Sequence, residues 1–89
     1  MASTNRLLLS ALLRGLSDAV DRNDEAAADR YRTRIGLIAR QHFDTNPQVG
    51  EALEQLLSAS SRWLATKTAE RYEMEQQVLE HIQSVMDLV

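Results

Sequence analysis

Two histidines are the residues of this chain best suited to acid–base chemistry or metal binding. Neither His42 nor His81 has a second imidazole three or four residues away, the spacing that brings two side chains together on a helix. Glu80 precedes His81, but adjacent helical residues point about 100° apart and cannot chelate one metal ion together. We therefore expect His42 at a helix end and His81 beside an interface, with no catalytic residue, no metal site and no cofactor.

Sequence motifs that would indicate an enzyme are absent. The chain contains no GxxxxGK[ST], GxGxxG, HExxH or GxSxG pattern, and it has no cysteine that would act as a nucleophile or form a disulfide. These absences favour a protein that acts by binding rather than by catalysis. The lack of cysteine also fits the cytoplasm, which is the location we expect.

Arginines are the other residues whose spacing suggests a site. The densest basic run contains Arg30, Arg32, Arg34 and Arg40. Arg30 and Arg34 share one helix face, and three acidic residues between positions 24 and 29 lie close enough to balance them. A small regulator that binds nucleic acid through these arginines is therefore an alternative function. The net charge of −3 argues against it, because nucleic-acid binders usually carry a basic stripe.

The composition is that of one small helical domain spanning residues 1–89. Apolar residues make up 44% of the 89 residues, a share typical of a globular chain rather than a disordered one. Three glycines and one proline are too few for the turns of a β-sandwich or barrel. The longest apolar run, residues 7–13, is far shorter than the roughly 20 residues that span a bilayer. Since Arg14 follows it and no cleavage site comes next, we expect neither a signal peptide nor a membrane partner.

Hydrophobic periodicity predicts an antiparallel helical hairpin over about residues 4–22 and 24–43. One arc of the first helix carries Leu8, Leu9, Leu12, Leu13, Leu16, Ala19 and Val20. Gly15 costs about 1 kcal/mol relative to alanine and permits a close helix approach. Because only one or two residues link the two helices, they must be antiparallel. Leu37 points outward on the side of Arg30 and Arg34, and these three residues form a candidate secondary contact surface.

The rest of the chain predicts one long helix over about residues 47–88. Asn46 is a good N-cap and Pro47 suits the first helical position. The apolar positions that follow keep one helical phase, and Trp63 among them is expected to anchor the core. This phase favours a continuous helix through residues 65–77, with a solvated spacer or a fold-back hinge as alternatives. The expected architecture is a three-helix bundle that dimerisation completes.

Such a long helix would extend beyond the hairpin. Forty helical residues span roughly 60 Å, whereas 19 residues span roughly 28 Å. The apolar C-terminal extension, residues 78–89, would then be uncovered, and an exposed apolar strip of this kind usually marks an interaction segment. We expect it to bind a second copy of the chain, or a helix of another protein, through Val78, Leu79, Ile82, Val85 and Met86.

Polar residues on the same face interrupt the apolar positions of the long helix. Across a dimer seam, Lys67 and Arg71 of one copy would meet Glu75 of the other and set the register. An isolated pair of Arg71 and Glu75 within one helix would contribute only a few tenths of a kcal/mol. These residues therefore form the predicted register-setting layer.

The expected order of two short helices and a long helix with an apolar C-terminal stripe resembles flagellar and type III export chaperones. The resemblance covers the layout of the chain and no diagnostic motif, and it implies a chaperone-like function. From the residues themselves we expect a non-enzymatic interaction module: an adaptor, chaperone, regulator or inhibitor. It would act by burying or occluding a partner surface, which needs no catalytic residue.

Overall fold

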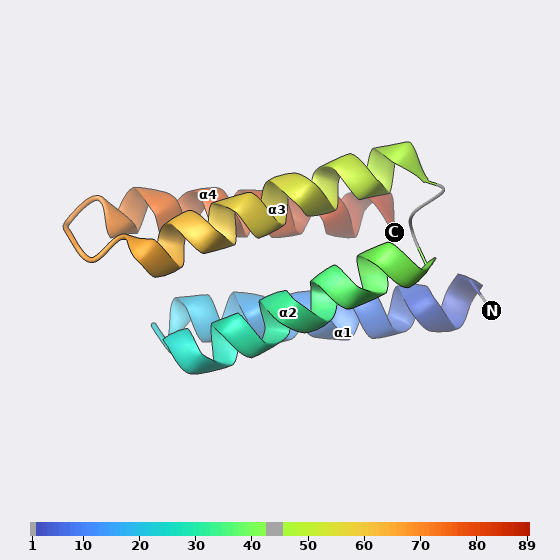
Figure 1. The fold of residues 1–89 in the computed structure, drawn as a ribbon, viewed down its shortest axis with the longest axis horizontal. Coiled ribbons are helices and arrows are strands. Elements are labelled where there is room, and N and C mark those ends of the chain that lie inside the picture. The colour runs from blue at the N-terminus through green and yellow to red at the C-terminus, as the bar shows by residue number, and fades with distance from the viewer. Residues whose placement is uncertain (1, 43–45) are drawn as a thin grey trace.

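The computed structural model describes residues 2–42 and 46–89 as four helices in an up-down-up-down bundle (Figure 1). They are α1 (Ala2–Asp21), α2 (Glu25–His42), α3 (Pro47–Ala65) and α4 (Arg71–Leu88). Neighbours contact in ring order: α1 with α2, α2 with α3, α3 with α4, and α4 with α1. Both termini lie at the end of the bundle opposite the α1–α2 and α3–α4 turns. No helix in these ranges is long and apolar enough to cross a membrane.

The predicted N-terminal hairpin is confirmed, and its tight turn explains why the two helices must be antiparallel. Asn23 adopts a left-handed conformation with φ of 58°, which asparagine tolerates better than most residues. Its N–H donates to Val20 O, and the Asp24 N–H donates to Ala19 O at 2.8 Å, so the turn is a Schellman motif. Asp24 then caps α2 by accepting the Ala27 N–H at 3.1 Å. The chain thus reverses within three residues, 22–24.

The prediction of one continuous helix over residues 47–88 is wrong. Its beginning is correct, since Asn46 Oδ1 accepts the Val49 N–H at 3.2 Å and Pro47 opens α3. However, Thr66 leaves the helical conformation at φ −90° and ψ 120°, and the chain folds back before α4 begins at Arg71. The fold-back hinge, considered above as an alternative, is the structure observed. The bundle is therefore closed by α4 of the same chain and not by a second copy.

Burial of apolar surface explains why the chain folds back. The helix is interrupted in a polar segment, residues 66–70. The end of α3 keeps hydrogen bonds there, because the Thr66 N–H and hydroxyl both donate to Arg62 O. Folding back buries aliphatic side chains of α4, each of which is stabilised by about 1.5–3 kcal/mol relative to exposure. The apolar residues of α3 and α4 share one helical phase in the sequence, and each of the two helices turns its apolar stripe toward the same core.

The core runs along the bundle axis between the two hairpins. Trp63 is 1% exposed, which confirms it as a core anchor. The buried apolar residues are Leu9, Leu12, Leu13, Leu16, Ala19, Val20, Ala27, Ala28, Ile35, Ile38, Val49, Leu53, Leu56, Ala59, Trp63, Val78, Ile82 and Val85.

Gly15 leaves room on α1 for a side chain of α2. A Cβ atom at this position would lie within 3.0 Å of three atoms of the Tyr31 ring. The Tyr31 side chain therefore packs directly on the α1 backbone. By contrast, a Cβ at Gly36 would meet Leu57 Cδ1 at 3.7 Å, an ordinary van der Waals distance.

Gly15→Ala should lower the free energy of unfolding by about 1–3 kcal/mol, because the new methyl group must displace the Tyr31 ring. Gly36→Ala is the matched control and should raise it by about 0.5–1 kcal/mol, through higher helix propensity without a clash. Urea unfolding followed by circular dichroism measures both. An equal gain in stability for the two variants would contradict the close packing of Tyr31 on α1.

Ile82→Ala should lower the free energy of unfolding by about 2–5 kcal/mol, because it leaves a cavity in the core of the bundle. Leu37→Ala, at a position that is 53% exposed, should change it by less than about 0.5 kcal/mol. The same unfolding measurement tests this pair. Similar small effects at both positions would indicate that α4 does not pack in the core.

Candidate protein-interaction face

The predicted C-terminal interface is part of the core. Val78, Ile82 and Val85 are 0%, 4% and 0% exposed. Leu79 and Met86 are half-buried and pack against the same cluster. The premise of the predicted interface, an uncovered apolar stripe on residues 78–89, is therefore wrong, because the fold-back places this stripe against α1 and α3.

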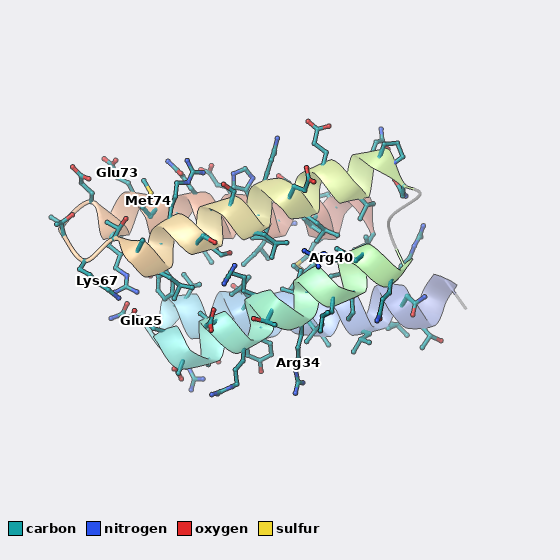
Figure 2. All side chains as sticks on the ribbon, in the orientation of Figure 1. Glu25, Arg34, Arg40, Lys67, Glu73 and Met74 are labelled. Atoms are coloured by element: carbon teal, nitrogen blue, oxygen red, sulfur yellow. The ribbon has the colours of Figure 1, made fainter. Side chains whose placement is uncertain are left out.

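The predicted register-setting layer also finds its partner within the chain. Lys67 Nζ bonds to Glu25 Oε1, and Arg71 Nη1 bonds to Glu25 Oε2 at 3.3 Å. Glu75 is half-buried one turn further along α4. Figure 2 shows Lys67 beside the Glu25 end of α2. Lys67 and Arg71 thus join the two hairpins of one chain. Sequence reasoning missed Glu25 because it assigned Lys67 and Arg71 to a seam with Glu75 of a second copy.

Arg71 is the most buried charged group of this cluster. Its side chain is 16% exposed, and its guanidinium lies 4.2 Å from the centre of the Trp63 ring. Two of its nitrogens, Nε and Nη2, have no hydrogen-bond partner in the described structure. The cation–π contact with Trp63 and the ion pair with Glu25 offset part of that desolvation. The cluster therefore links the turn ends of the two hairpins through one shared carboxylate.

The hydrogen bond from Lys67, and to a smaller extent the one from Arg71, holds the pKa of Glu25 below its ordinary value of 4.5. A carboxylate with a lowered folded-state pKa stabilises the fold above its unfolded pKa, and this contribution disappears as the pH falls through the folded pKa. The Glu25 cluster therefore stabilises the bundle at neutral pH but not in acid.

His81 is the histidine whose side-chain surroundings the structure describes. His81 is half-buried and lines a shallow hollow between α3 and α4 with Glu54, Ser58 and Arg62. His42 ends α2 as predicted, and its side chain is outside the described residues. No group of three His, Cys, Asp or Glu side chains within the described ranges could hold a metal ion.

A pair of exposed leucines lies on the outer side of α1 and α2. Leu8 is 49% exposed and Leu37 is 53% exposed. They border a hollow of about 270 Å³ between the two helices. We call this surface the α1–α2 face, and it consists of Leu8, Leu12, Arg34, Leu37, Ile38 and Gln41.

Regular spacing along α2 continues the α1–α2 face toward the turn. Arg30, Arg34, Leu37 and Gln41 follow one another at intervals of three or four residues and so form one exposed stripe. Figure 2 shows Arg34 pointing away from the bundle. The predicted secondary surface of Arg30, Arg34 and Leu37 is therefore exposed as one stripe. Leu8 was expected in the core but is 49% exposed, at the edge of the apolar arc of α1.

Charge is unevenly distributed along the α1–α2 hairpin. Residues 2–17 and 30–41 contain six arginines and no aspartate or glutamate. The acidic residues of this hairpin are confined to residues 18–29, near the turn. Within the described residues, ion pairs involve Arg22, Arg32, Lys67 and Arg71. Arg30 and Arg34 make no ion pair there, although both line a hollow with Asp24 near the turn. The α3–α4 hairpin has the opposite balance, with three basic and seven acidic residues over 46–89.

Comparison of this chain with protein-family models, curated proteins and solved structures finds no match. The layout that resembles export chaperones, with a long third helix, is not the layout observed. The function therefore has to be argued from the surface of the bundle itself.

Glu25→Gln should lower the stability at neutral pH and should flatten its dependence on pH, because the neutral amide loses the charge attraction of Lys67 and Arg71. The stability difference from wild type should shrink as the pH falls below 4.5, the ordinary pKa of the carboxyl. Urea midpoints measured over a pH series test this. Glu80→Gln, at an exposed position of α4, is the control and should keep the wild-type profile. A pH-independent difference for Glu25→Gln would contradict the ion-pair assignment.

Proposed function

We propose that this protein is a non-enzymatic interaction module that binds another protein through the α1–α2 face. Binding would bury or occlude a surface of the partner, as an adaptor, chaperone or inhibitor does. The observation that carries the proposal is the hollow between α1 and α2, with two exposed leucines at its rim. The proposed mechanism requires no catalytic residue, metal or cofactor.

Exposure of both leucines is unfavourable for so small a domain. A single exposed leucine is ordinary, because much of any protein surface is apolar. Leu8 and Leu37 instead border one concave surface, above Leu12 and Ile38, which are 7% and 8% exposed. A partner side chain seated there would extend the core outward and exclude water, as anchor residues do at the centre of protein interfaces.

The charge of the α1–α2 face favours a different protein over a second copy. In a two-fold dimer the same patch meets itself, so Arg30 and Arg34 of both copies would bring four arginines into one interface. Like charges brought together in an interface oppose association. The homodimer expected from the sequence was also based on residues 78–89, which the bundle itself covers.

Nucleic-acid binding is the second candidate function, and the six arginines of residues 2–17 and 30–41 are the observation in its favour. Phosphate contacts would engage the arginines but would leave Leu8 and Leu37 in water, because the phosphate backbone offers them no apolar partner. The leucines therefore make a protein the preferred ligand. Nucleic-acid binding predicts an affinity that falls steeply with salt and is unaffected by Leu8→Ser.

The test places a photo-crosslinking residue, p-benzoylphenylalanine, at position 37 of the protein expressed in cells. This residue should capture one discrete protein. Its aromatic side chain keeps position 37 apolar, so binding should survive. Leu8→Glu in the same protein should abolish the product, because a carboxylate at the rim cannot be buried there without cost. Gln76, on the exposed side of α4, is the control position and should give no such product.

Three results would contradict the proposed function. The first is a crosslinked product at position 37 that persists in the Leu8→Glu variant. The second is the same product when the crosslinking residue is at position 76. The third is a product at position 37 that contains nucleic acid instead of protein. Unchanged circular dichroism and thermal midpoint for Leu8→Glu would show that the fold is intact.

A further inference from the structure

We infer that the partner presents an acidic amphipathic helix, whose apolar side enters the hollow of the α1–α2 face and whose carboxylates pair with Arg30 and Arg34. The inference rests on the proposed function and adds to it the chemistry of the partner. It follows from the shape of the hollow, the hydrogen-bonding state of its walls and the charge around it.

The hollow lies in the groove between two antiparallel helices. Leu8 of α1 forms one rim and Leu37 of α2 forms the other, while Leu12 and Ile38 form the floor. The backbone groups of both walls are paired within α1 and α2, so an extended peptide would find no strand edge to join. Recognition must come from side chains. A helix that inserts apolar residues at i, i+3 or i+4, and i+7 into a groove is the mode that fits such walls.

Arg30 and Arg34 determine the sign of charge that the partner must carry. They are one helical turn apart, about 6 Å along α2, and both are exposed. Carboxylates spaced i, i+4 on a helix lying along α2 would match this separation. The guanidinium group binds a carboxylate through two parallel hydrogen bonds, which would set the orientation of the incoming helix. Since residues 30–41 carry no carboxylate of their own, these pairs would not have to displace an internal partner.

An anionic membrane is the other surface that combines apolar contact with negative charge. Membrane-surface helices present a wide, convex apolar face to the lipid. Here the apolar faces of α1 and α2 point into the core, and the remaining apolar surface is a concave site. The shape therefore favours the insertion of a side chain from a partner helix over insertion into lipid.

The test uses two designed helical peptides that differ only in charge. Both carry leucines at i, i+4 and i+7, flanked by glutamates in one peptide and by lysines in the other. Each is titrated into the full-length ¹⁵N-labelled protein, and binding is followed by amide chemical shifts. We expect the glutamate peptide to shift the amides of Leu8, Leu12, Leu37 and Ile38, and the lysine peptide to bind at least about tenfold more weakly.

Two variants with the same change in net charge make the test specific. Arg34→Glu, on the α1–α2 face, should weaken binding of the glutamate peptide about tenfold and strengthen binding of the lysine peptide. Arg14→Glu is the matched control, because Arg14 is exposed on α1 but lines the opposite groove with Leu79 and Met86 of α4. It should leave both affinities within about twofold. Higher salt should weaken the wild-type interaction with the glutamate peptide.

The inference is overturned if the two peptides bind equally, if neither shifts the amides of the α1–α2 face, or if the two arginine variants behave alike. It is also overturned if phosphatidylglycerol vesicles or a DNA duplex, and not the glutamate peptide, perturb these amides. Crosslinking at position 37 separates this failure from failure of the proposed function. A captured protein without glutamate-peptide binding would refute the acidic helix and leave the interaction face in place.

Discussion

The packing of α4 onto α1 and α3 is the contact on which the rest of the structure depends. It closes the bundle, covers the C-terminal apolar stripe and brings the turn at residues 66–70 next to the start of α2. A domain of this size buries a smaller fraction of its surface on folding than a larger domain does. This chain also has no disulfide that would add stability. Leaving one of four apolar stripes in water would therefore remove a large share of the driving force for folding.

The same fold-back explains the contacts of the polar residues around the turn. Glu25, Lys67 and Arg71 come together only when the α3–α4 hairpin lies on the α1–α2 hairpin. Lys67 and Glu25 are exposed enough that solvent screens much of their attraction, whereas Arg71 is held between Glu25 and the Trp63 ring. The cluster therefore contributes more to the alignment of the two hairpins than to total stability, which comes from the apolar core.

The surface that remains after the core has formed is uneven in charge and in polarity. Arg34, which makes no ion pair within the described residues, borders one hollow with the exposed Leu8 and Leu37, while the α3–α4 hairpin is acidic. The bundle thus has one face on which apolar contact and electrostatic attraction act together. Electrostatic attraction contributes mainly to orientation and to the rate of encounter, and apolar burial contributes mainly to affinity.

The sequence by itself determined the helical class, the first hairpin and the beginning of α3. These features depend on local signals: the 3.6-residue period, the N-cap Asn46 and the short link between the first two helices. It also identified the outward stripe of Arg30, Arg34 and Leu37, because a helix face can be derived from spacing alone. Gly15 was recognised for a similar reason, since the absence of a side chain is itself a local property.

Only the tertiary structure decided whether the apolar residues of α4 belong to an interface or to the core. Val78, Ile82 and Val85 keep the helical phase of Val49 and Leu53, so periodicity describes a continuous helix and a folded-back pair equally well. The choice depends on how much apolar surface the whole chain can bury, which is a property of all its helices together. Leu8 was misplaced for the same reason, because an apolar arc on a helix does not reveal how far its neighbours reach.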